Sequence, residues 1–469
     1  MQYISTRTGA PILEFEDVVL TGLANDGGLY VPKVWPQISA DNHILDMDDV
    51  DYVELAFEII RPYIEDKCIE DIKLKCLIDD SYKPFKRPSV APLVQIESNA
   101  WMLELFHGPT LAFKDFALQF LGRMFEHILT KRDKRLTIIG ATSGDTGSAA
   151  IEACKGRDNL DIFMLHPLGR VSDVQRRQMT TVLDSNVHNI AIEGTFDDCQ
   201  DLVKEMFNDA LFRDDLNVSA VNSINWARVM AQIVYYFYAV SRLKKYDRPI
   251  SFIVPTGNFG NVYAGYSAIQ MGLNAANLVV ASNHNDILTR FFETGDMSIM
   301  PVKPSLSPSM DIQVSSNFER LLFDFYDRDG EAVSNSIKMF REEGVLPGGN
   351  KIHSLASNIF SGYSTNDEGT LLAIKQLYDD RGVLVDPHTA VGLGALKQLK
   401  NNETLHVVLA TAHPAKFPDA VKQATGINPD LPTFLSDLYD REERFTKLNN
   451  NLSAVESYIR DVMSSKIHC

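Results

Sequence analysis

The alternation of short apolar runs with helical patterns predicts an α/β fold whose parallel sheets are covered by helices. The runs Leu136–Gly140 and Ile250–Pro255 are predicted to be buried strands, and the helical patterns Gly144–Lys155 and Asn261–Met271 follow them directly. This spacing is typical of strand–helix–strand units, in which both faces of the sheet are buried. Ligands of such folds bind beyond the carboxyl ends of the strands. The loops directly after strands are therefore the expected places for chemistry.

The 469 residues are too many for one compact core, and we expect three sections. Residues 1–95 predict a small N-terminal α/β domain, with an amphipathic helix near Val50–Tyr63 and a proline-containing linker at Lys83–Pro92. Residues 96–430 hold the strand–helix alternation and predict a core of two parallel-sheet subdomains. The last section, residues 431–469, is predicted to form two charged amphipathic helices.

Further strands and helices complete the predicted core. Four more apolar runs predict strands, at Asp161–Leu165, Val187–Ile192, Leu278–Ala281 and His406–Ala410. Ser223–Arg242 has apolar residues on several faces, which predicts a long buried helix. Residues 283–350 contain a proline-rich patch and are interpreted as an insertion near the site, with a helix around Asn317–Phe325.

The amino-acid composition limits the classes of molecule that the protein is expected to bind. The formal net charge is −17, so the surface as a whole repels nucleic acid and anionic membranes. The five cysteines are widely spaced without a CxxC pair, which favours reduced thiols over a disulfide frame or a metal site. Because the sequence shows neither a signal peptide nor an apolar stretch of membrane-spanning length, a cytoplasmic protein is expected. An anionic ligand would therefore need hydrogen-bond donors in its own binding site, to overcome the unfavourable electrostatic field of the negatively charged protein.

The first candidate loop is TGNFGN, from Thr256 to Asn261, directly after a predicted strand. Its glycines, Gly257 and Gly260, let the backbone curl so that consecutive N–H groups point inward, and the next helix adds its positive N-terminal end. Such a nest suits a phosphate, and the lack of a lysine argues against a nucleotide P-loop. A tight turn that binds no ligand explains the pattern equally well.

The second candidate loop, ATSGDTGS at 141–148, also follows a predicted strand. It is rich in hydroxyls and backbone donors at a helix start, which suits a carboxylate or the polar edge of an aromatic ring. The alternative is structural, with Ser143 or Asp145 serving only as the N-cap of the helix.

The third candidate is Lys114, in the segment HGPTLAFKDF at 107–116. A lysine in so apolar a run can be a helix residue whose charged end reaches solvent. The functional alternative is an amine with a lowered pKa that acts as nucleophile and base. The neighbouring Asp115 is discounted as a catalytic partner because consecutive helix residues do not face each other.

Together the three loops resemble those of fold-type II pyridoxal-phosphate enzymes, which share the fold of the tryptophan synthase β chain. More narrowly, the motifs resemble the threonine synthase family: HGPTLAFKD, ATSGDTG and GNFGN are accompanied by YISTRTGAP, NDGGLYVP, NWAR at 225–228, SSNFER at 315–320 and TAHP at 411–414. These motifs span nearly the whole chain in family order. The GNFGN form and the N-terminal domain resemble the longer branch of the family, found in many bacteria and fungi.

The resemblance implies how pyridoxal phosphate would be held. Lys114 would carry the cofactor as a Schiff base and then shuttle protons. The cofactor phosphate would bind to the loop residues Gly257, Asn258, Phe259, Gly260 and Asn261. Asp145 would lie beside the phenolic oxygen. Thr411 would lie beside the pyridine nitrogen, although without the family context it is better interpreted as a strand-end cap.

The resemblance also implies a substrate, O-phosphohomoserine, which reacts with water to give threonine and inorganic phosphate as the last step of threonine biosynthesis. Its carboxylate would be bound by Ser143, Gly144 and Thr146. Candidates for its phosphate are, in decreasing order, Arg320, Asn317, Ser316 and Lys416. Arg320 and Lys416 could equally be solvated surface charges. His107 and His413 flank the motifs and are interpreted as structural histidines.

Two rival functions remain open at this point. Another fold-type II lyase, such as a dehydratase or phospholyase, would share the lysine and the glycine loop but would lack NDGGLYVP and SSNFER. A non-catalytic homologue that senses pyridoxal phosphate or a phosphorylated metabolite would not need Lys114, GNFGN and Thr411 together. The oligomeric state is left between monomer and homodimer.

Overall fold

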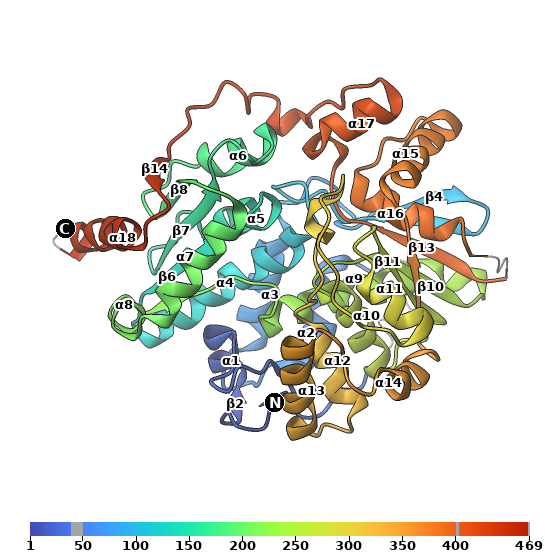
Figure 1. Cartoon of the computed structure of the whole chain (residues 1–469), viewed down its shortest axis with the longest axis horizontal. Helices are drawn as coiled ribbons and strands as arrows, with labels where there is room; N and C mark the ends of the chain where they lie inside the picture. Colours follow the sequence, from blue (N-terminus) through green and yellow to red (C-terminus); the bar gives the residue numbers. More distant parts are fainter. Residues whose placement is uncertain (39–49, 400–402, 468–469) are drawn as a thin grey trace. The chain divides into compact units, whose positions relative to one another are not determined.

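The computed structural model describes residues 1–38, 50–399 and 403–467. Its internal contacts divide the chain into two compact units (Figure 1). Unit 1 comprises Met1–Val18, Leu23–Ala117 and Ser223–Pro429, and unit 2 comprises Val19–Gly22, Leu118–Asn222 and Asp430–Cys469. Each unit contains a mainly or wholly parallel sheet, which confirms the predicted fold class.

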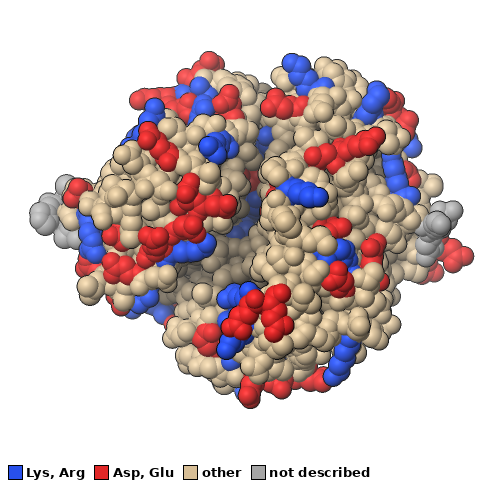
Figure 2. All heavy atoms as spheres, viewed as in Figure 1, with Lys and Arg blue, Asp and Glu red and all other residues tan. Residues whose placement is uncertain are grey.

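Charged side chains are mixed on the molecular surface. On the face shown in Figure 2, acidic and basic groups are interspersed, and the basic ones form no continuous patch there. Among the described residues, no helix is both long enough and apolar enough to cross a membrane. Four cysteines lie in the described part of the chain, all as free thiols: Cys68, Cys76, Cys154 and Cys199.

The main sheet of unit 1 has six strands in the order β12-β11-β10-β13-β5-β4. They are β4 (Leu93–Glu97), β5 (Ala100–Glu104), β10 (Ile250–Pro255), β11 (Asn277–Ser282), β12 (Phe360–Ser364) and β13 (Leu405–Ala410). All neighbours are parallel except β4, which runs antiparallel to β5. Every residue of β10 and β13 is buried, which explains why these strands are continuous apolar runs rather than alternating ones.

The N-terminal part of unit 1 forms a small antiparallel sheet in the order β2-β1-β3, from Leu13–Glu14, Gln2–Ser5 and Tyr30–Pro32. It is followed by α2 (Tyr52–Ile60) and α3 (Asp71–Tyr82). The predicted helix Val50–Tyr63 is thus α2 continued by a 3₁₀ turn at Arg61–Tyr63. Asp51 determines its start, because its carboxylate accepts from the N–H groups of Val53 and Glu54.

The remaining helices of unit 1 cover the main sheet and extend from it. They are α9 (Trp226–Leu243), α10 (Gly260–Gln270), α11 (Ile287–Thr294), α12 (Phe318–Phe325), α13 (Gly330–Glu343), α14 (Gly349–Ala356), α15 (Asp367–Arg381), α16 (Pro387–Leu396) and α17 (Pro418–Thr425). The predicted helix Ser223–Arg242 begins three residues late, at Trp226, because the Asn225 side chain caps it. The apolar face of α16 packs against β10, β11 and β13 (Figure 1).

Unit 2 is built on a five-stranded parallel sheet in the order β14-β8-β7-β6-β9. Its strands are β6 (Leu136–Ala141), β7 (Leu160–Pro167), β8 (Val187–Glu193), β9 (Val218–Ser219) and β14 (Thr446–Asn449). Its helices are α5 (Asp145–Cys154), α6 (Asp173–Thr180), α7 (Phe196–Asn208), α8 (Ala210–Asp215) and α18 (Leu452–Ile467), together with most of α4 (Lys114–Arg132). Apolar residues of α7, α8 and α18 pack with the sheet strands in one core cluster.

The prediction of two helices in the C-terminal section was wrong. The section contains a 3₁₀ turn at Thr433–Leu435, then strand β14, and only then the single long helix α18. Strand β14 forms because it pairs with the open edge of β8, with Lys447 opposite Ala191. Its sequence, TKLN, contains no β-branched or aromatic run of its own, so only the long-range pairing reveals the strand.

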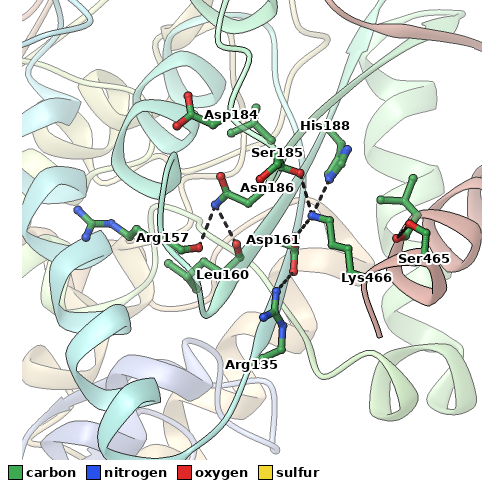
Figure 3. A network of polar contacts seen from close by, with 12 residues as sticks. Arg135, Arg157, Leu160, Asp161, Asp184, Ser185, Asn186, His188, Ser465 and Lys466 are labelled. Atoms are coloured by element: carbon green, nitrogen blue, oxygen red, sulfur yellow. Dashed lines mark hydrogen bonds and ion pairs between the residues drawn. The ribbon is translucent and has the colours of Figure 1, made fainter. Parts of the chain in front are cut away.

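The end of α18 is attached to the unit 2 sheet by Lys466 (Figure 3). Its ammonium group forms an ion pair with the fully buried Asp161 of β7. It also donates to the Ser185 carbonyl at 2.9 Å and lies 3.3 Å from Nε2 of His188. Burial lowers the pKa of His188 to about 4, so at neutral pH its ring is uncharged and can accept this bond.

Replacing Lys466 with methionine is therefore expected to destabilise unit 2. The change removes one cation from a fully buried carboxylate and leaves Arg135, which is half exposed, as the other cation bonded to Asp161. Loss of one partner of a buried pair costs about 3–5 kcal/mol, and we expect the lower end because Arg135 remains. Urea unfolding followed by circular dichroism measures the loss. Lys447→Met, at an exposed position of β14, is the control, and equal stability of the two variants would contradict the expectation.

Candidate active site

Three neighbouring strands of the unit 1 sheet end at the predicted site residues. Strands β10, β13 and β5 lie side by side and parallel, so their carboxyl ends share one edge of the sheet. The loop from Thr256 to Asn261 follows β10, Thr411 follows β13, and the segment that leads to Lys114 follows β5. The structure therefore places these predicted groups at adjacent strand ends, where ligands bind in such folds.

The segment before Lys114 is bonded to the end of β13 by the backbone. The N–H of Phe113 donates to the Thr411 carbonyl at 2.9 Å, and the N–H of His413 donates to the Leu111 carbonyl at 3.0 Å. The N–H of Thr411 donates in turn to the hydroxyl of the buried Thr389 at 3.2 Å. Lys114 and Thr411, which lie about 300 positions apart in the sequence, are thus held on neighbouring segments.

Lys114 is the first residue of α4, and it is 9% exposed. Its Nζ lies 5.9 Å from the centre of the Phe113 ring. This burial does not fit a lysine whose charged end reaches solvent. Asp115 has a separate structural task, because its carboxylate accepts from the N–H of Thr110 at 2.9 Å and from the Thr110 hydroxyl at 2.6 Å.

The loop after β10 is shaped by one residue that the sequence did not indicate. Phe259 has φ +62°, in the left-handed region, and is the N-cap of α10, so the predicted curl depends on Phe259 rather than on glycine. Gly257 is needed for close packing instead, since a Cβ there would lie 2.6 Å from the Ser309 carbonyl oxygen. Because α10 begins at Gly260, its first N–H groups have no acceptor within the helix and can bind an anion.

Asn261 shows that this loop fits a phosphate. The residue is 7% exposed, and its Oδ1 accepts hydrogen bonds from two buried tyrosines of α9. Its Nδ2 is buried without a hydrogen-bond partner among the described residues. A buried amide N–H without a partner costs free energy unless a ligand accepts from it. A phosphate oxygen is such an acceptor.

The SSNFER segment at 315–320 lies against the loop after β10, within the region predicted to be an insertion near the site. The Ser315 hydroxyl donates to the Gly257 carbonyl at 2.8 Å. Asn317 donates to the Asn258 carbonyl through its Nδ2 at 2.9 Å and through its backbone N–H at 3.1 Å. The half-buried Ser316 bonds to the Asn258 side chain at 3.2 Å and lies 3.3 Å from the Ser223 hydroxyl.

Arg320 and Lys416 are both 0% exposed, so neither is a solvated surface charge. The Arg320 guanidinium donates to the Tyr30 carbonyl at 3.0 and 3.1 Å, to the Ile224 carbonyl at 2.6 Å, and to the Asn317 side chain. Its donors therefore hold the chain that precedes α9. Lys416 donates from Nζ to the Thr110 carbonyl at 2.8 Å, close to the Lys114 segment.

Arg228 was not singled out as a site residue, although it belongs to the NWAR motif. It lies in the first turn of α9 and is 5% exposed, with Nε and one terminal nitrogen lacking a hydrogen-bond partner among the described residues. Burial lowers its pKa to about 10, which still leaves it charged at neutral pH. A buried cation without a counter-charge is expected to bind an anionic ligand.

The loop 141–148 lies in unit 2, directly after β6 as predicted. The N-cap of α5 is Gly144, so neither Ser143 nor Asp145 is the cap. The Thr142 hydroxyl instead accepts from the N–H groups of Gly144 and Gly147 at 3.0 and 2.9 Å. Ser143 is exposed and Thr146 is half-buried.

Asp145 is held by α6. Its Oδ1 accepts from Nε2 of Gln175 at 2.8 Å. Gln175 also requires the glycine at 144, because a Cβ there would lie 2.5 Å from the Gln175 side-chain carbon. The carboxylate of Asp145 therefore has a defined orientation at the helix start.

The two histidines near the motifs have structural partners, in agreement with the sequence interpretation. His107 Nε2 lies 2.6 Å from the Glu104 carboxylate. His413 accepts from the N–H of Ala415 at 3.2 Å, and burial lowers its pKa to about 4. His413 is therefore uncharged at neutral pH.

Family models cover most of the chain. The threonine synthase N-terminal model matches residues 2–82, the pyridoxal-phosphate-dependent enzyme model matches residues 88–356, and the threonine synthase C-terminal model matches residues 389–459. A threonine synthase from Pseudomonas aeruginosa is 52% identical over 98% of this chain and 98% of its own length. The chain belongs to the threonine synthase family.

Solved structures of threonine synthases agree with this membership. The pyridoxal-phosphate-bound threonine synthase from Brucella melitensis has a TM-score of 0.95 and 50% identity, over 98% of this chain and 99% of that chain. The yeast threonine synthase has a TM-score of 0.94 and 40% identity, over 99% of both chains. As a member of the threonine synthase family, the chain is a pyridoxal-phosphate-dependent lyase of fold type II.

Proposed function

We propose that this enzyme converts O-phosphohomoserine and water to threonine and inorganic phosphate. Membership of the threonine synthase family supports the reaction. Its relatives carry the name threonine synthase over nearly the full length of this chain. The observation that carries the choice of a phosphorylated, anionic substrate is the buried Arg228, whose guanidinium has two nitrogens without a hydrogen-bond partner among the described residues.

The cofactor would be held by groups at the three strand ends. Lys114 would bind it covalently, residues Gly257–Asn261 would bind its phosphate, and Thr411 would lie at its pyridine nitrogen. When bound there, pyridoxal phosphate supplies an electron sink for charge developed on the substrate. A hydroxyl at Thr411, unlike a carboxylate, does not enforce a fully protonated ring. Asp145 of unit 2 is proposed to lie at the phenolic oxygen.

Lys114 would also move the protons. Once the substrate amine has displaced it, its Nζ is free to take the proton from the substrate α-carbon. Loss of a β-proton and of phosphate from the γ-carbon, addition of water at the β-carbon, and return of protons to the α- and γ-carbons would then complete the conversion to threonine. Burial of Lys114 supports this role, because it keeps the reacting amine away from bulk water, which would compete for the protons.

The anionic groups of the substrate need separate donors. We assign the substrate carboxylate to Ser143, Gly144 and Thr146 in the loop after β6. For the substrate phosphate we add Arg228 to Ser316 and Lys416, and we move Arg320 and Asn317 behind them, because the Arg320 guanidinium and the Asn317 amide already donate to backbone carbonyls. Arg320 and Asn317 then support the site by holding the turn at 223–224 that leads into α9.

A product assay tests the proposal. Purified enzyme loaded with pyridoxal phosphate is given O-phosphohomoserine, and inorganic phosphate and threonine are measured in parallel. We expect equal amounts of the two products. Phosphate released together with a keto acid and ammonia would instead identify a phospholyase, and binding without turnover would identify a sensor.

We also propose the cellular location and the oligomeric state of the enzyme. A net charge of −17 and a small-molecule substrate support an enzyme of the cytoplasm that binds neither nucleic acid nor membrane. We propose a monomer or homodimer, which sedimentation of the purified enzyme distinguishes.

A further inference from the structure

We propose that Tyr235 and Tyr236 are positioning residues that aim the Asn261 amide at the cofactor phosphate. The inference rests on the proposed function of Gly257–Asn261 as the phosphate loop. It concerns two consecutive tyrosines in the middle of α9, a helix that packs along α10. Neither tyrosine belongs to a motif that pointed to the cofactor.

Both phenol groups contact the same amide. The Tyr235 hydroxyl donates to Asn261 Oδ1 at 2.6 Å. The Tyr236 hydroxyl lies 2.9 Å from the same Oδ1 and 2.8 Å from the Asn261 carbonyl oxygen. Tyr235, Tyr236 and Asn261 are almost fully buried, so water does not compete for these bonds. The Tyr235 bond, together with the single Tyr236 O–H shared between the two Asn261 oxygens, fixes both the backbone and the side chain of Asn261.

The tyrosines remain hydrogen-bond donors at any physiological pH. Burial raises the pKa of both phenols well above its ordinary value, so both keep their protons. A phenol that must donate pairs with the amide oxygen, and the amide nitrogen then points away from the two rings. That nitrogen, Nδ2 of Asn261, is the buried donor without a partner among the described residues.

Tyr235 also touches the other half of the cofactor site. Its ring meets that of Phe116 edge to face, with the ring centres 5.6 Å apart. Phe116 follows Lys114 by two residues in the first turn of α4. Tyr236 is equally constrained, because its ring packs against Phe252 of β10 and fills the space left by Gly265 of α10. Tyr235 therefore links the start of the Lys114 helix to the phosphate loop.

The fixed amide would make a specific contribution to cofactor binding. An amide N–H held in place loses little conformational entropy when the phosphate binds, and a bond to a charged acceptor is stronger than a neutral one. Without the phenols, the Asn261 side chain could turn its oxygen toward the phosphate and repel it. The tyrosines thus act through Asn261 and need not touch the cofactor.

The test compares Tyr235→Phe and Tyr236→Phe with Tyr263→Phe. Tyr263 lies on α10 and is also buried, but its hydroxyl donates to Asp324 at 3.3 Å instead of to Asn261. The full chain, stripped of cofactor, is titrated with pyridoxal phosphate and separately with inorganic phosphate. We expect Tyr235→Phe and Tyr236→Phe to weaken both affinities about five- to tenfold, the effect of one lost hydrogen bond. Tyr263→Phe should leave both affinities unchanged.

A further variant, Asn261→Asp, tests the assignment of the phosphate loop separately from the role of the tyrosines. Aspartate keeps the oxygen that accepts from both phenols but replaces the N–H donor with a negative charge, so phosphate affinity should fall on the order of 100-fold. If Asn261→Asp binds pyridoxal phosphate normally, the assignment of the phosphate loop is wrong and the proposal falls with it. If Asn261→Asp loses affinity while both tyrosine variants bind like the parent, the loop assignment stands and the role of the tyrosines is overturned.

Discussion

Replacing Lys114 with alanine is expected to abolish turnover, with a loss of at least about 10³–10⁴-fold. The change removes the amine that we propose to hold the cofactor covalently and to move the substrate protons. The variant should still bind pyridoxal phosphate through the loop after β10, but without the visible absorbance band of a lysine–cofactor linkage. Absorbance spectra, borohydride reduction followed by peptide mapping, and the product assay measure the three effects.

The control for this variant is Lys134→Ala, at an exposed lysine just beyond the end of α4. It should retain the absorbance band and normal turnover. Lys114→Arg separates the two roles of the amine from its charge, because arginine keeps a cation but forms no such linkage and is a poor base. A reduced cofactor mapped to any other lysine in the parent enzyme would contradict the assignment of Lys114.

The strands around the site could be predicted because their burial can be recognised from the residues of each strand alone. A strand covered on both faces must be apolar at every position, and Ile250–Pro255 was predicted with the bounds that the structure shows for β10. Its neighbour β13 begins one residue before the predicted His406. Since the loops that follow parallel strands lie at one edge of the sheet, correct strands were enough to bring Thr256 and Thr411 to one edge, whereas β5, the strand that precedes Lys114, was not predicted.

The features that escaped prediction depend on partners far away in the sequence. Strand β14 exists because β8 has an open edge, and its four residues carry no strand signal of their own. Phe259 adopts a left-handed conformation although two glycines flank it, because its ring is buried against Phe292 and Phe318. In both cases tertiary packing outweighed the local preference on which sequence reasoning relies.

The arginines show the same limit at the site itself. Arg320 and Arg228 both lie in motifs that carry the family resemblance, and the resemblance made Arg320 but not Arg228 a candidate ligand of the substrate phosphate. Only the structure shows that the Arg320 donors are bonded to Tyr30 and Ile224, whereas two nitrogens of Arg228 are left without a protein partner in the described chain. Hydrogen bonds decide which buried cation stabilises the fold and which one is available to bind an anion. The spacing of residues in the sequence does not reveal these bonds.

Arg228→Met is expected to impair catalysis and to stabilise the fold, or at least not to weaken it. If Arg228 binds the substrate phosphate as proposed, its loss should raise KM and lower kcat/KM by about 10²–10³-fold, the usual effect of removing one charged donor from a site. Affinity for pyridoxal phosphate should stay within about twofold of the parent, because the loop after β10 supplies that phosphate with its own donors. Meanwhile the folded protein no longer buries an unpaired charge, so the thermal midpoint should be equal or higher.

Arg320→Met is the matched comparison, because both arginines are buried and both lie near Trp226. Arg320 contacts the Trp226 ring, and Arg228 follows Trp226 by two residues. Removing the Arg320 guanidinium removes its hydrogen bonds to the carbonyls of Tyr30 and Ile224, and each lost hydrogen bond from a charged donor costs about 1.5–3 kcal/mol. The Arg320 variant should therefore lose stability and lose activity only as a consequence. Opposite signs in the thermal midpoints of the two variants would distinguish a ligand-binding arginine from a structural one. A destabilised Arg228→Met with normal KM would show that Arg228 has protein partners in solution, and its role at the substrate phosphate would be wrong.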